Sequence, residues 1–233
     1  MDLISSLSTA VLIPALNEEG SISKVIASIP AAYRNLVVVV DNGSTDHTAL
    51  QARNSGAVVL TEPVRGYGRA CLNGLDYLSR LETPPEVVVF LDGDFSDYPE
   101  EMPSLINPIL EGKAHLVIGA RGAVNRQSGS MTTPQIFGNW LSAKLIRFFY
   151  GVSFSDLGPF RAIRFSTLKK LNLRDKDFGW TVEMQVKAAK MKIPCMEVPV
   201  RYRKRIGKSK VSGTVKGTIL AGYKILFTIF RNL

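Results

Sequence analysis

Two aspartates that follow an apolar run are the residues of this chain best suited to chemistry. Residues 87–91 are apolar and are followed by Asp92, Gly93 and Asp94, and residues two apart in an extended chain project to the same side. With Cα atoms about 6–7 Å apart, the two carboxylates would repel each other by roughly 3 kcal/mol at an effective dielectric near 20. A divalent cation would reverse this repulsion, and carboxylate oxygens suit Mg²⁺ or Mn²⁺. The pattern predicts a metal site, unless the acidic turn only ends a strand.

Acidic residues also follow two other apolar runs. Glu18 comes shortly after residues 9–13, and Asp41 directly follows residues 36–40. Predicted strands alternate with predicted helices through the first half of the chain, which indicates a largely parallel α/β sheet with ligands at the carboxyl ends of its strands. We therefore expect these acidic residues to meet at one edge. The alternative for Glu18 is a surface position in the first turn of a helix capped by Asn17.

Length and composition limit the possible number of domains and the possible classes of partner. The 233 residues are 45% hydrophobic and contain no linker-like or repetitive segment, so we expect one domain. The cysteines match no metal or redox spacing and the start has no secretory pattern, which favours a reducing cytosol. The formal charge of +9 favours an anionic partner, such as nucleic acid, a membrane surface or a phosphorylated substrate.

A glycine pair raises the alternative of a dinucleotide-binding fold. Gly66 and Gly68 have Cys71 in the third position of the fingerprint, and they follow the third predicted strand, residues 57–60, rather than the first. The nicotinamide fingerprint requires a third glycine and a place directly after the first strand. We therefore set this alternative aside.

Four segments occur in the order typical of one enzyme family: Pro14-Ala15-Leu16-Asn17-Glu18-Glu19, Asp41-Asn42-Gly43-Ser44-Thr45-Asp46, Gly66-Tyr67-Gly68-Arg69-Ala70, and Asp92-Gly93-Asp94 with Pro99-Glu100. Together they resemble the family-2 glycosyltransferases of the GT-A fold, most of all the dolichyl-phosphate mannose synthase and polyprenyl-phosphate glycosyltransferase branch. The resemblance covers nearly the whole chain. It implies a Rossmann-like, mostly parallel mixed sheet flanked by helices, a C-terminal amphipathic helix, and inverting, metal-dependent transfer from a UDP- or GDP-sugar.

The resemblance also implies residue roles at the donor. Asp92 and Asp94 would face the sugar and hold Mg²⁺ or Mn²⁺. Leu16 stands where an aromatic residue is common and Asn42 replaces a second aspartate, so the base remains open. The residues expected to bind the donor are Pro14, Ala15, Leu16, Glu18, Asp41, Asn42, Gly66, Arg69, Gly93, Arg205, Lys208 and Lys210.

The last three of these residues belong to a basic run. Residues 201–210 carry six basic side chains and no acidic one, and Gly207 and Ser209 resemble the family's loop that closes over the donor diphosphate. A solvated surface or a nucleic-acid arm is the ordinary alternative. No RNA-binding aromatic motif or helix-turn-helix accompanies the run, so we expect no nucleic-acid partner.

The acceptor side is predicted from the second half of the chain. Arg121 resembles the family's Gly-x-Arg element, and residues 155–161 resemble an element near the acceptor. Asp156 could be a general base or an orienting residue, while Arg161 could hold an acceptor phosphate, as Arg121 could, or pair with Asp156. Glu183 begins a helix and either faces the site or compensates the helix dipole. The predicted catalytic residues are Asp92, Asp94, Asp156 and Glu183.

Two apolar segments bear on the acceptor and the membrane. Residues 136–150 are rich in aromatics and include Lys144 and Arg147, which fits a core helix or a helix in a membrane interface. Residues 214–230 are too short and too charged for a transmembrane helix. We expect a peripheral protein at the cytoplasmic face of an anionic membrane.

These expectations combine into one prediction with stated alternatives. Residues 1–120 would bind the nucleotide-sugar, residues 121–210 would form the acceptor side, and residues 211–233 would form the C-terminal helix. The predicted acceptor is a polyprenyl or dolichyl phosphate. The alternatives are transfer to a saccharide hydroxyl, a nucleotidyltransferase, and a non-catalytic protein that binds membrane or RNA. The sugar and the oligomeric state remain open.

Overall fold

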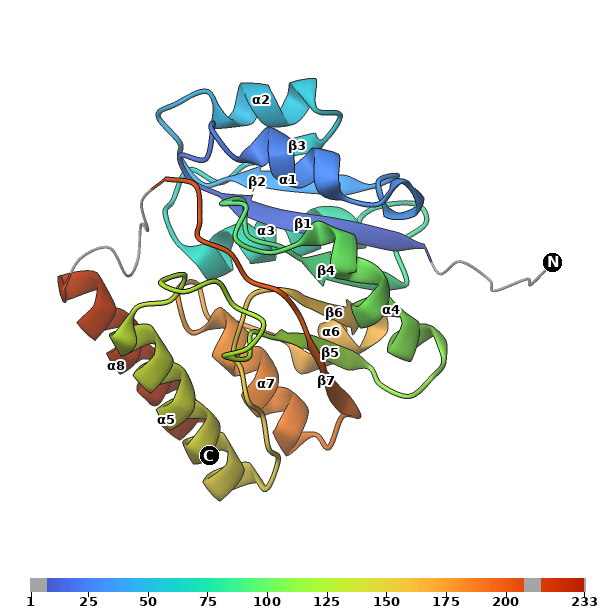
Figure 1. The fold of residues 1–233 in the computed structure, drawn as a ribbon. Helices are drawn as coiled ribbons and strands as arrows, with labels where there is room; N and C mark the ends of the chain where they lie inside the picture. Colours follow the sequence, from blue (N-terminus) through green and yellow to red (C-terminus); the bar gives the residue numbers. More distant parts are fainter. Residues whose placement is uncertain (1–7, 208–214, 233) are drawn as a thin grey trace.

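The computed structural model describes residues 8–207 and 215–232, and its side chains in the last segment from residue 222 onward. A seven-stranded sheet runs through the molecule, with helices on both faces (Figure 1). The strands are, in chain order, β1 (Thr9–Ala15), β2 (Val37–Asp41), β3 (Val58–Thr61), β4 (Val87–Phe90), β5 (Leu116–Ala120), β6 (Arg161–Arg164) and β7 (Cys195–Pro199). Their order across the sheet is β3-β2-β1-β4-β6-β5-β7.

The sheet is parallel except at one strand. β6 pairs antiparallel with both β4 and β5, whereas β1 pairs parallel with β2 and β4, and β7 pairs parallel with β5. This arrangement confirms the predicted α/β class with a mostly parallel mixed sheet. The sequence did not predict β6, because its four residues begin and end with arginine and only Ala162 and Ile163 resemble a buried strand.

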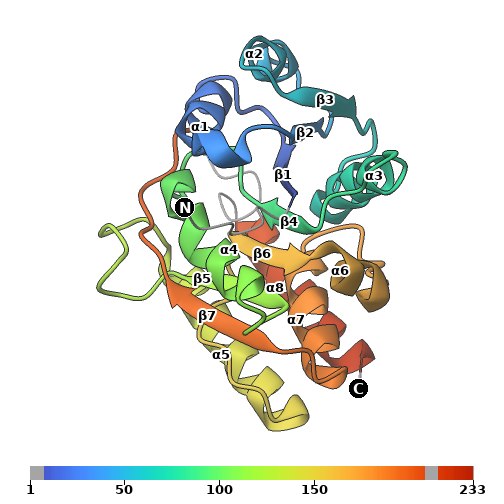
Figure 2. The ribbon, with the colours of Figure 1, turned by 90° about the vertical axis from the view of Figure 1, so that its right-hand side faces the viewer.

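Side chains alternate along the strands and build a core on each face of the sheet. In β1, Ala10 and Leu12 pack on one face, while Val11 and Ile13 pack on the other. The second face is covered by α1 (Ile22–Ser28), α2 (Thr48–Asn54) and α4 (Met102–Leu110). The first face is covered by α3 (Tyr67–Ser79), α5 (Thr133–Tyr150), α6 (Phe165–Leu171), α7 (Trp180–Lys190) and α8 (Val215–Arg231). Figure 2 shows these helix layers on opposite sides of the sheet.

Two short 3₁₀ helices complete the elements, at Ala31–Tyr33 and Pro99–Glu101. The helix predicted to follow an Asn17 cap begins later, at Ile22, and its N-cap is Ser21. The Asn17 side-chain oxygen instead accepts a hydrogen bond from the Thr45 amide at 2.8 Å. Residues 16–21 are therefore a connecting turn, and Glu18 is not a first-turn residue.

The helices α5 and α8 lie side by side away from the sheet's first strands (Figure 1). The Phe149 and Phe230 rings meet edge to face with centroids 5.5 Å apart, and the Tyr150 hydroxyl donates to the Ile229 carbonyl at 2.9 Å. The predicted C-terminal helix is thus present and docked on the domain. Within the described ranges, no helix is long and apolar enough to cross a membrane.

Candidate active site

A cavity of about 620 Å³ opens where β1, β2 and β4 end. This is the edge of an open α/β sheet at which ligands are expected. Residues from both halves of the chain form its wall. The predicted site residues that line it are Pro14, Ala15, Leu16, Glu18, Asn42, Gly66, Asp92, Gly93, Asp94, Arg121 and Arg205.

The two aspartates after β4 differ in environment. Asp94 is 3% exposed, and its Oδ1 accepts hydrogen bonds from the Ser96 amide at 2.9 Å and the Ser96 hydroxyl at 2.6 Å. Its Oδ2 pairs with Arg205 Nη2 at 2.8 Å. Asp92 is half-buried, and burial, together with the charge of Asp94, raises its pKa. The pair therefore holds electrostatic strain that a cation in the cavity would relieve.

A third carboxylate, which sequence reasoning missed, lies beneath this pair. Asp97 is buried, and neither of its carboxylate oxygens has a hydrogen-bond partner among the described residues. Burial, and then the charge of Asp92, raise the pKa of Asp97 well above its usual value, so the protonated form is favoured. In the described part of the chain, no three His, Cys, Asp or Glu side chains are grouped to hold a metal. Asp92 and Asp94 both line the cavity, as predicted.

The segment after β7 crosses back over the sheet toward α1 (Figure 1). It pairs with the loop after β4, since the Arg203 amide donates to the Ser96 carbonyl and the Ile206 amide donates to the Asp94 carbonyl, both at 2.9 Å. These bonds bring Arg205 to Asp94 across more than a hundred residues of chain. The remaining predicted basic residues, Lys208 and Lys210, lie outside the described residues.

Asn42, which stands where an aspartate was expected, shapes the cavity wall. Its amide nitrogen donates to the carbonyls of Glu62 at 3.0 Å and Val64 at 2.8 Å, and its amide oxygen accepts from the Gly66 amide at 2.8 Å. A carboxylate could make only the last of these bonds. Asn42 thus fixes the loop that carries Arg65 to the cavity.

Gly66, the N-cap of α3, and Gly68, in its first turn, allow a close backbone contact. A Cβ atom on Gly68 would overlap the Asp175 carbonyl, and one on Gly66 would overlap the Lys176 carbonyl. The Arg69 amide donates to the Lys176 carbonyl at 3.0 Å, and the Arg69 side chain is not part of the cavity wall. The segment predicted to bind the donor is therefore packed against a loop from the second half of the chain.

Asp41 lies at the end of β2, as predicted, and is buried. Its Oδ1 accepts from the Ser44 amide at 3.3 Å. Asp41 precedes Asn42 in the chain, but it is not among the residues that line the cavity.

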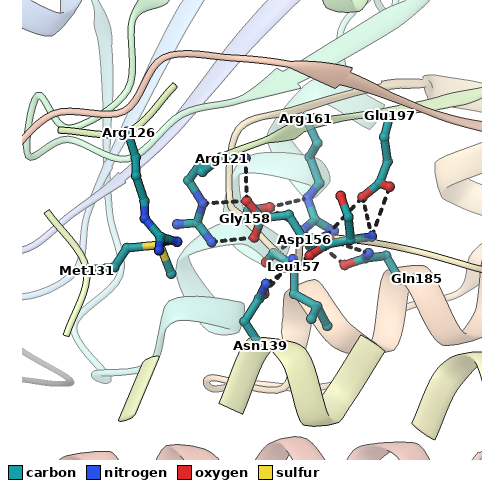
Figure 3. Close-up of polar contacts among 11 residues, drawn as sticks. Arg121, Arg126, Met131, Asn139, Asp156, Leu157, Gly158, Arg161, Gln185 and Glu197 are labelled. Atoms are coloured by element: carbon teal, nitrogen blue, oxygen red, sulfur yellow. Dashed lines mark hydrogen bonds and ion pairs between the residues drawn. The ribbon is translucent and has the colours of Figure 1, made fainter. Parts of the chain in front are cut away.

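Arg121, which lines the cavity, forms an ion pair with Asp156 (Figure 3). Asp156 Oδ2 accepts from the Arg121 amide at 2.7 Å and from Nε at 2.8 Å, while Oδ1 accepts from Nη2 at 2.7 Å. Burial disfavours the charged form of Asp156, but the charge and hydrogen bonds of Arg121 outweigh burial and lower its pKa. Asp156 is therefore built to orient Arg121 rather than to accept a proton.

Arg161 lies in a different environment from the one predicted. It is 1% exposed, and its guanidinium donates to the carbonyls of Gly158, Thr181 and Leu157. Figure 3 shows it on the far side of Asp156 from Arg121. Its donors are used by the backbone, so it supports the 157–158 segment and does not reach the cavity wall.

Glu183 is likewise engaged elsewhere. Its Oε2 accepts from the amides of Arg174 at 2.9 Å and Asp175 at 2.7 Å, and its Oε1 pairs with Lys187 at 2.8 Å. It lines a separate cavity, not the one at Asp92. Glu183 holds the loop that packs against Gly66 and Gly68 at the start of α3.

Several residues that line the cavity were not predicted as site residues. The Tyr202 ring lies under Arg121, with the guanidinium carbon 4.9 Å from its centroid. Ile225 of α8 joins the wall from the C-terminal helix. The others come from α5, from the loop between α5 and β6, and from α7 with the loop before it: Gln135, Leu157, Pro159, Asp177, Phe178 and Thr181. Only tertiary folding brings these segments together.

Comparison with known proteins gives consistent matches. The family model described as glycosyl transferase family 2 matches residues 10–171. A glycosyltransferase of Mycobacterium tuberculosis, itself named as uncharacterized, is 36% identical to this chain over 214 residues. The alignment covers 91% of this chain and 93% of that protein. The undecaprenyl-phosphate mannosyltransferase of Micrococcus luteus is 29% identical over 218 residues, with 88% of each chain covered.

Solved structures match the fold. The structure of glucosyl-3-phosphoglycerate synthase from Mycobacterium tuberculosis, in complex with Mn²⁺, uridine diphosphate and phosphoglyceric acid, aligns with a TM-score of 0.75 at 23% identity. The alignment covers 97% of this chain and 78% of that one.

Proposed function

Since this chain belongs to glycosyl transferase family 2 and is a glycosyltransferase that uses a nucleotide-sugar, we propose that it transfers the sugar, with inversion and with Mg²⁺ or Mn²⁺, to a polyprenyl phosphate. The observation that carries this proposal is one cavity lined both by the Asp92 and Asp94 carboxylates and by the Arg121 guanidinium. The first set suits a metal-bound diphosphate, and the second suits an acceptor phosphate.

The residues present fit a divalent cation. Asp92 and Asp94 offer hard oxygen ligands, and their mutual repulsion disfavours a cavity without a cation. Two carboxylates leave positions for phosphate oxygens, as Mg²⁺ requires. When bound, the ion would neutralise charge on the departing nucleoside diphosphate. The similar synthase structure contains Mn²⁺ and uridine diphosphate, which supports this proposal.

The chain's own residues would share the remaining work. Pro14, Leu16 and the Asn42-supported loop form the wall on the donor side, and Arg205 stands where it can turn from Asp94 toward the diphosphate. Arg121, held by Asp156, would position the acceptor phosphate. Residues 1–120 would thus serve the donor and residues 121–210 the acceptor.

Transfer to a phosphate acceptor would not require a general base, and the two predicted bases are engaged in other contacts. A phosphate monoester is mostly dianionic at neutral pH. Its oxygen can form a bond to the anomeric carbon while the bond to the diphosphate oxygen breaks and the electron pair leaves with the nucleoside diphosphate. Asp156 and Glu183, the predicted bases, are both occupied by hydrogen bonds. A relative named undecaprenyl-phosphate mannosyltransferase supports this acceptor class.

A small phosphorylated hydroxyl acceptor is the second candidate. The similar synthase structure holds phosphoglyceric acid, and Arg121 could equally bind the phosphate of such a molecule. This acceptor would need a base for its hydroxyl.

The metal and donor parts of the proposal are tested together. With a panel of labelled UDP- and GDP-sugars and Mn²⁺, Asp94→Asn should reduce turnover by at least about a hundredfold, because loss of one group that stabilises developing charge costs roughly 3–4 kcal/mol. A chelator should abolish turnover. Full activity in chelator would remove the metal role, and release of pyrophosphate would indicate a nucleotidyltransferase.

A further inference from the structure

Arg203, in the segment after β7, donates to three consecutive carbonyls of the loop after β4. Its amide donates to the Ser96 carbonyl at 2.9 Å. Its side chain donates from Nε to the Phe95 carbonyl at 2.6 Å and from Nη2 to the Asp97 carbonyl at 3.0 Å. Hydrogen bonds from a charged donor are stronger than those between neutral groups, and the planar guanidinium fixes the positions of its acceptors relative to one another. One residue therefore holds the backbone of residues 95–97.

The Arg203 guanidinium also stacks on two aromatic rings of the same loop. Its central carbon lies 3.4 Å from the centroid of the Phe95 ring and 4.1 Å from that of the Tyr98 ring. A cation over the face of an aromatic ring is attracted to it, more strongly where water is partly excluded, and Arg203 is partly buried. The rings and the carbonyls thus hold the guanidinium in one place.

The backbone that Arg203 holds is strained at Phe95. Phe95 has a left-handed conformation with φ of 63°, which residues with a side chain rarely adopt and which persists where the surrounding structure holds it. Phe95 lies between Asp94 and Ser96, and both the amide and the hydroxyl of Ser96 donate to Asp94 Oδ1, at 2.9 and 2.6 Å. The conformation of Phe95 therefore decides where these two donors lie relative to the Asp94 carboxylate.

We propose that Arg203 is a positioning residue, which fixes the loop at residues 95–97 so that this loop orients the Asp94 carboxylate for a divalent cation. Arg203 is not among the residues that line the reaction cavity, so it acts through Asp94 and not on the substrate. Residues that orient a metal ligand commonly change metal affinity by about 10- to 100-fold. The inference rests on the metal part of the proposed function, but the orientation of the loop can be measured without a metal.

Amide hydrogen exchange tests the orientation of the loop in metal-free and donor-free protein. The Ser96 amide donates to Asp94 Oδ1, so its exchange, followed by NMR, reports whether this bond is kept. Arg203→Gln should speed the exchange of the Ser96 amide at least about tenfold, because a charge-assisted hydrogen bond exceeds the free energy that a tenfold change represents. Arg203→Lys should do the same, since an ammonium group has neither the planar fork nor the stacking surface.

Arg201→Gln is the matched control for these variants. Arg201 lies in the same segment, and its guanidinium also stacks on the Tyr98 ring, with its central carbon 4.2 Å from the centroid. Its charged partner is the Glu101 side chain and not a carbonyl of residues 95–97. Arg201→Gln therefore removes the same charge and a similar ring contact but should leave the exchange of the Ser96 amide unchanged. Thermal melts verify that each variant is folded.

Binding of Mn²⁺ in the absence of donor, measured by electron paramagnetic resonance of the free ion, tests the consequence for the metal. Arg203→Gln and Arg203→Lys should each weaken this binding about tenfold, and Arg201→Gln should not weaken it. The direction of the change is informative, because the loss of a positive charge near the site would by itself strengthen the binding of a cation. Orientation of Asp94 and simple charge thus predict opposite results for Arg203→Gln.

Three results would overturn the proposal. The first is wild-type exchange of the Ser96 amide in both folded Arg203 variants. The second is tighter Mn²⁺ binding by Arg203→Gln with wild-type binding by Arg203→Lys, which would reduce Arg203 to its charge. The third is an equal change in exchange and in Mn²⁺ binding for Arg201→Gln, which would indicate general destabilisation. If the wild-type protein binds no Mn²⁺, the proposed metal role fails, and faster Ser96 exchange in both Arg203 variants still supports the orientation of Asp94 by Arg203.

Discussion

Arg121 reaches the reaction cavity with its guanidinium already oriented by Asp156. Asp156→Asn should therefore raise the KM for the acceptor and leave donor affinity nearly unchanged. Breaking a buried ion pair also costs about 3–5 kcal/mol of stability. Glu183→Gln is the matched control, because it too removes a buried carboxylate that holds a loop and pairs with a cation.

Steady-state kinetics with variable acceptor distinguish these effects, provided that both variants are assayed well below their melting temperatures. An unchanged acceptor KM with a large fall in kcat for Asp156→Asn would instead mark Asp156 as a general base. An equal rise in KM for both variants would mean that the effect comes from lost stability.

Arg205 gives a second expectation at the residue scale. In the structure its guanidinium occupies Asp94 Oδ2, an oxygen that a metal ion would use. Arg205→Gln should tighten Mn²⁺ binding in the absence of donor by about threefold, because a partly exposed ion pair is worth roughly 0.2–1 kcal/mol. Its binding of nucleoside diphosphate with Mn²⁺ should weaken, while nucleoside binding should not.

Electron paramagnetic resonance of free Mn²⁺ measures the first quantity and calorimetry the second. Lys204→Gln is the control, since it removes one charge from the same segment at an exposed position without contact to Asp94. Weaker Mn²⁺ binding by Arg205→Gln than by Lys204→Gln would show that Arg205 does not compete with the ion.

At the scale of elements, the start of α3 depends on its close contact with the Asp175 loop. Gly68→Ala should lower the free energy of unfolding by about 1–3 kcal/mol, because the added methyl group would overlap the Asp175 carbonyl. Gly138→Ala is the control inside α5, where a Cβ atom would meet no neighbouring atom. That change should stabilise by roughly 0.5–1 kcal/mol. Denaturant unfolding with equal losses for both variants would contradict the packing account.

The strands that the sequence predicted best are those with uniform apolar runs. The strand at residues 87–91 and the two aspartates after it could be predicted from local sequence, because a strand buried on both faces is a continuous apolar run. β6 lacks that pattern, since it begins and ends with Arg161 and Arg164, and Arg164 donates to the distant Ile109 carbonyl. Its pairing with β4 and β5 is set by tertiary contacts.

The site residues also divide into those that local sequence predicts and those that depend on tertiary contacts. Asp92 and Asp94 could be predicted because a local strand positions them. The partner of Asp156 could not, because Arg121 lies 35 residues away along the chain and Arg161 was an equally good candidate by spacing. Glu183 was predicted to face the site from its place in a helix, but the contacts that hold it come from a separate loop.

For the molecule as a whole, the pair of α5 and α8 presents exposed aromatic side chains on the same part of the surface. Tyr223 and Phe227 are 64% and 44% exposed, and their rings stack with centroids 6.1 Å apart. Exposed aromatics beside lysines suit an anionic membrane interface. Tyr223→Ser with Phe227→Ser should weaken binding to anionic liposomes without lowering the melting temperature.

Liposome sedimentation measures this effect, and binding should also weaken with added salt. Leu50→Ser with Val64→Ser is the control, because these apolar residues are exposed to a similar degree and lie outside α5 and α8, in α2 and after β3. Equal loss of binding in both double variants would argue against a membrane role for α5 and α8.

Sugar transfer from a nucleotide-sugar to a polyprenyl phosphate can be measured in a single reaction. The protein is incubated with labelled UDP- and GDP-sugars, Mn²⁺, and polyprenyl phosphate, and the label in the organic extract is compared with the nucleoside diphosphate released. We predict equimolar appearance of both with one donor, and neither in chelator. Release of nucleoside diphosphate with the label only in a water-soluble hydroxyl product, and none in the organic extract, would contradict the account.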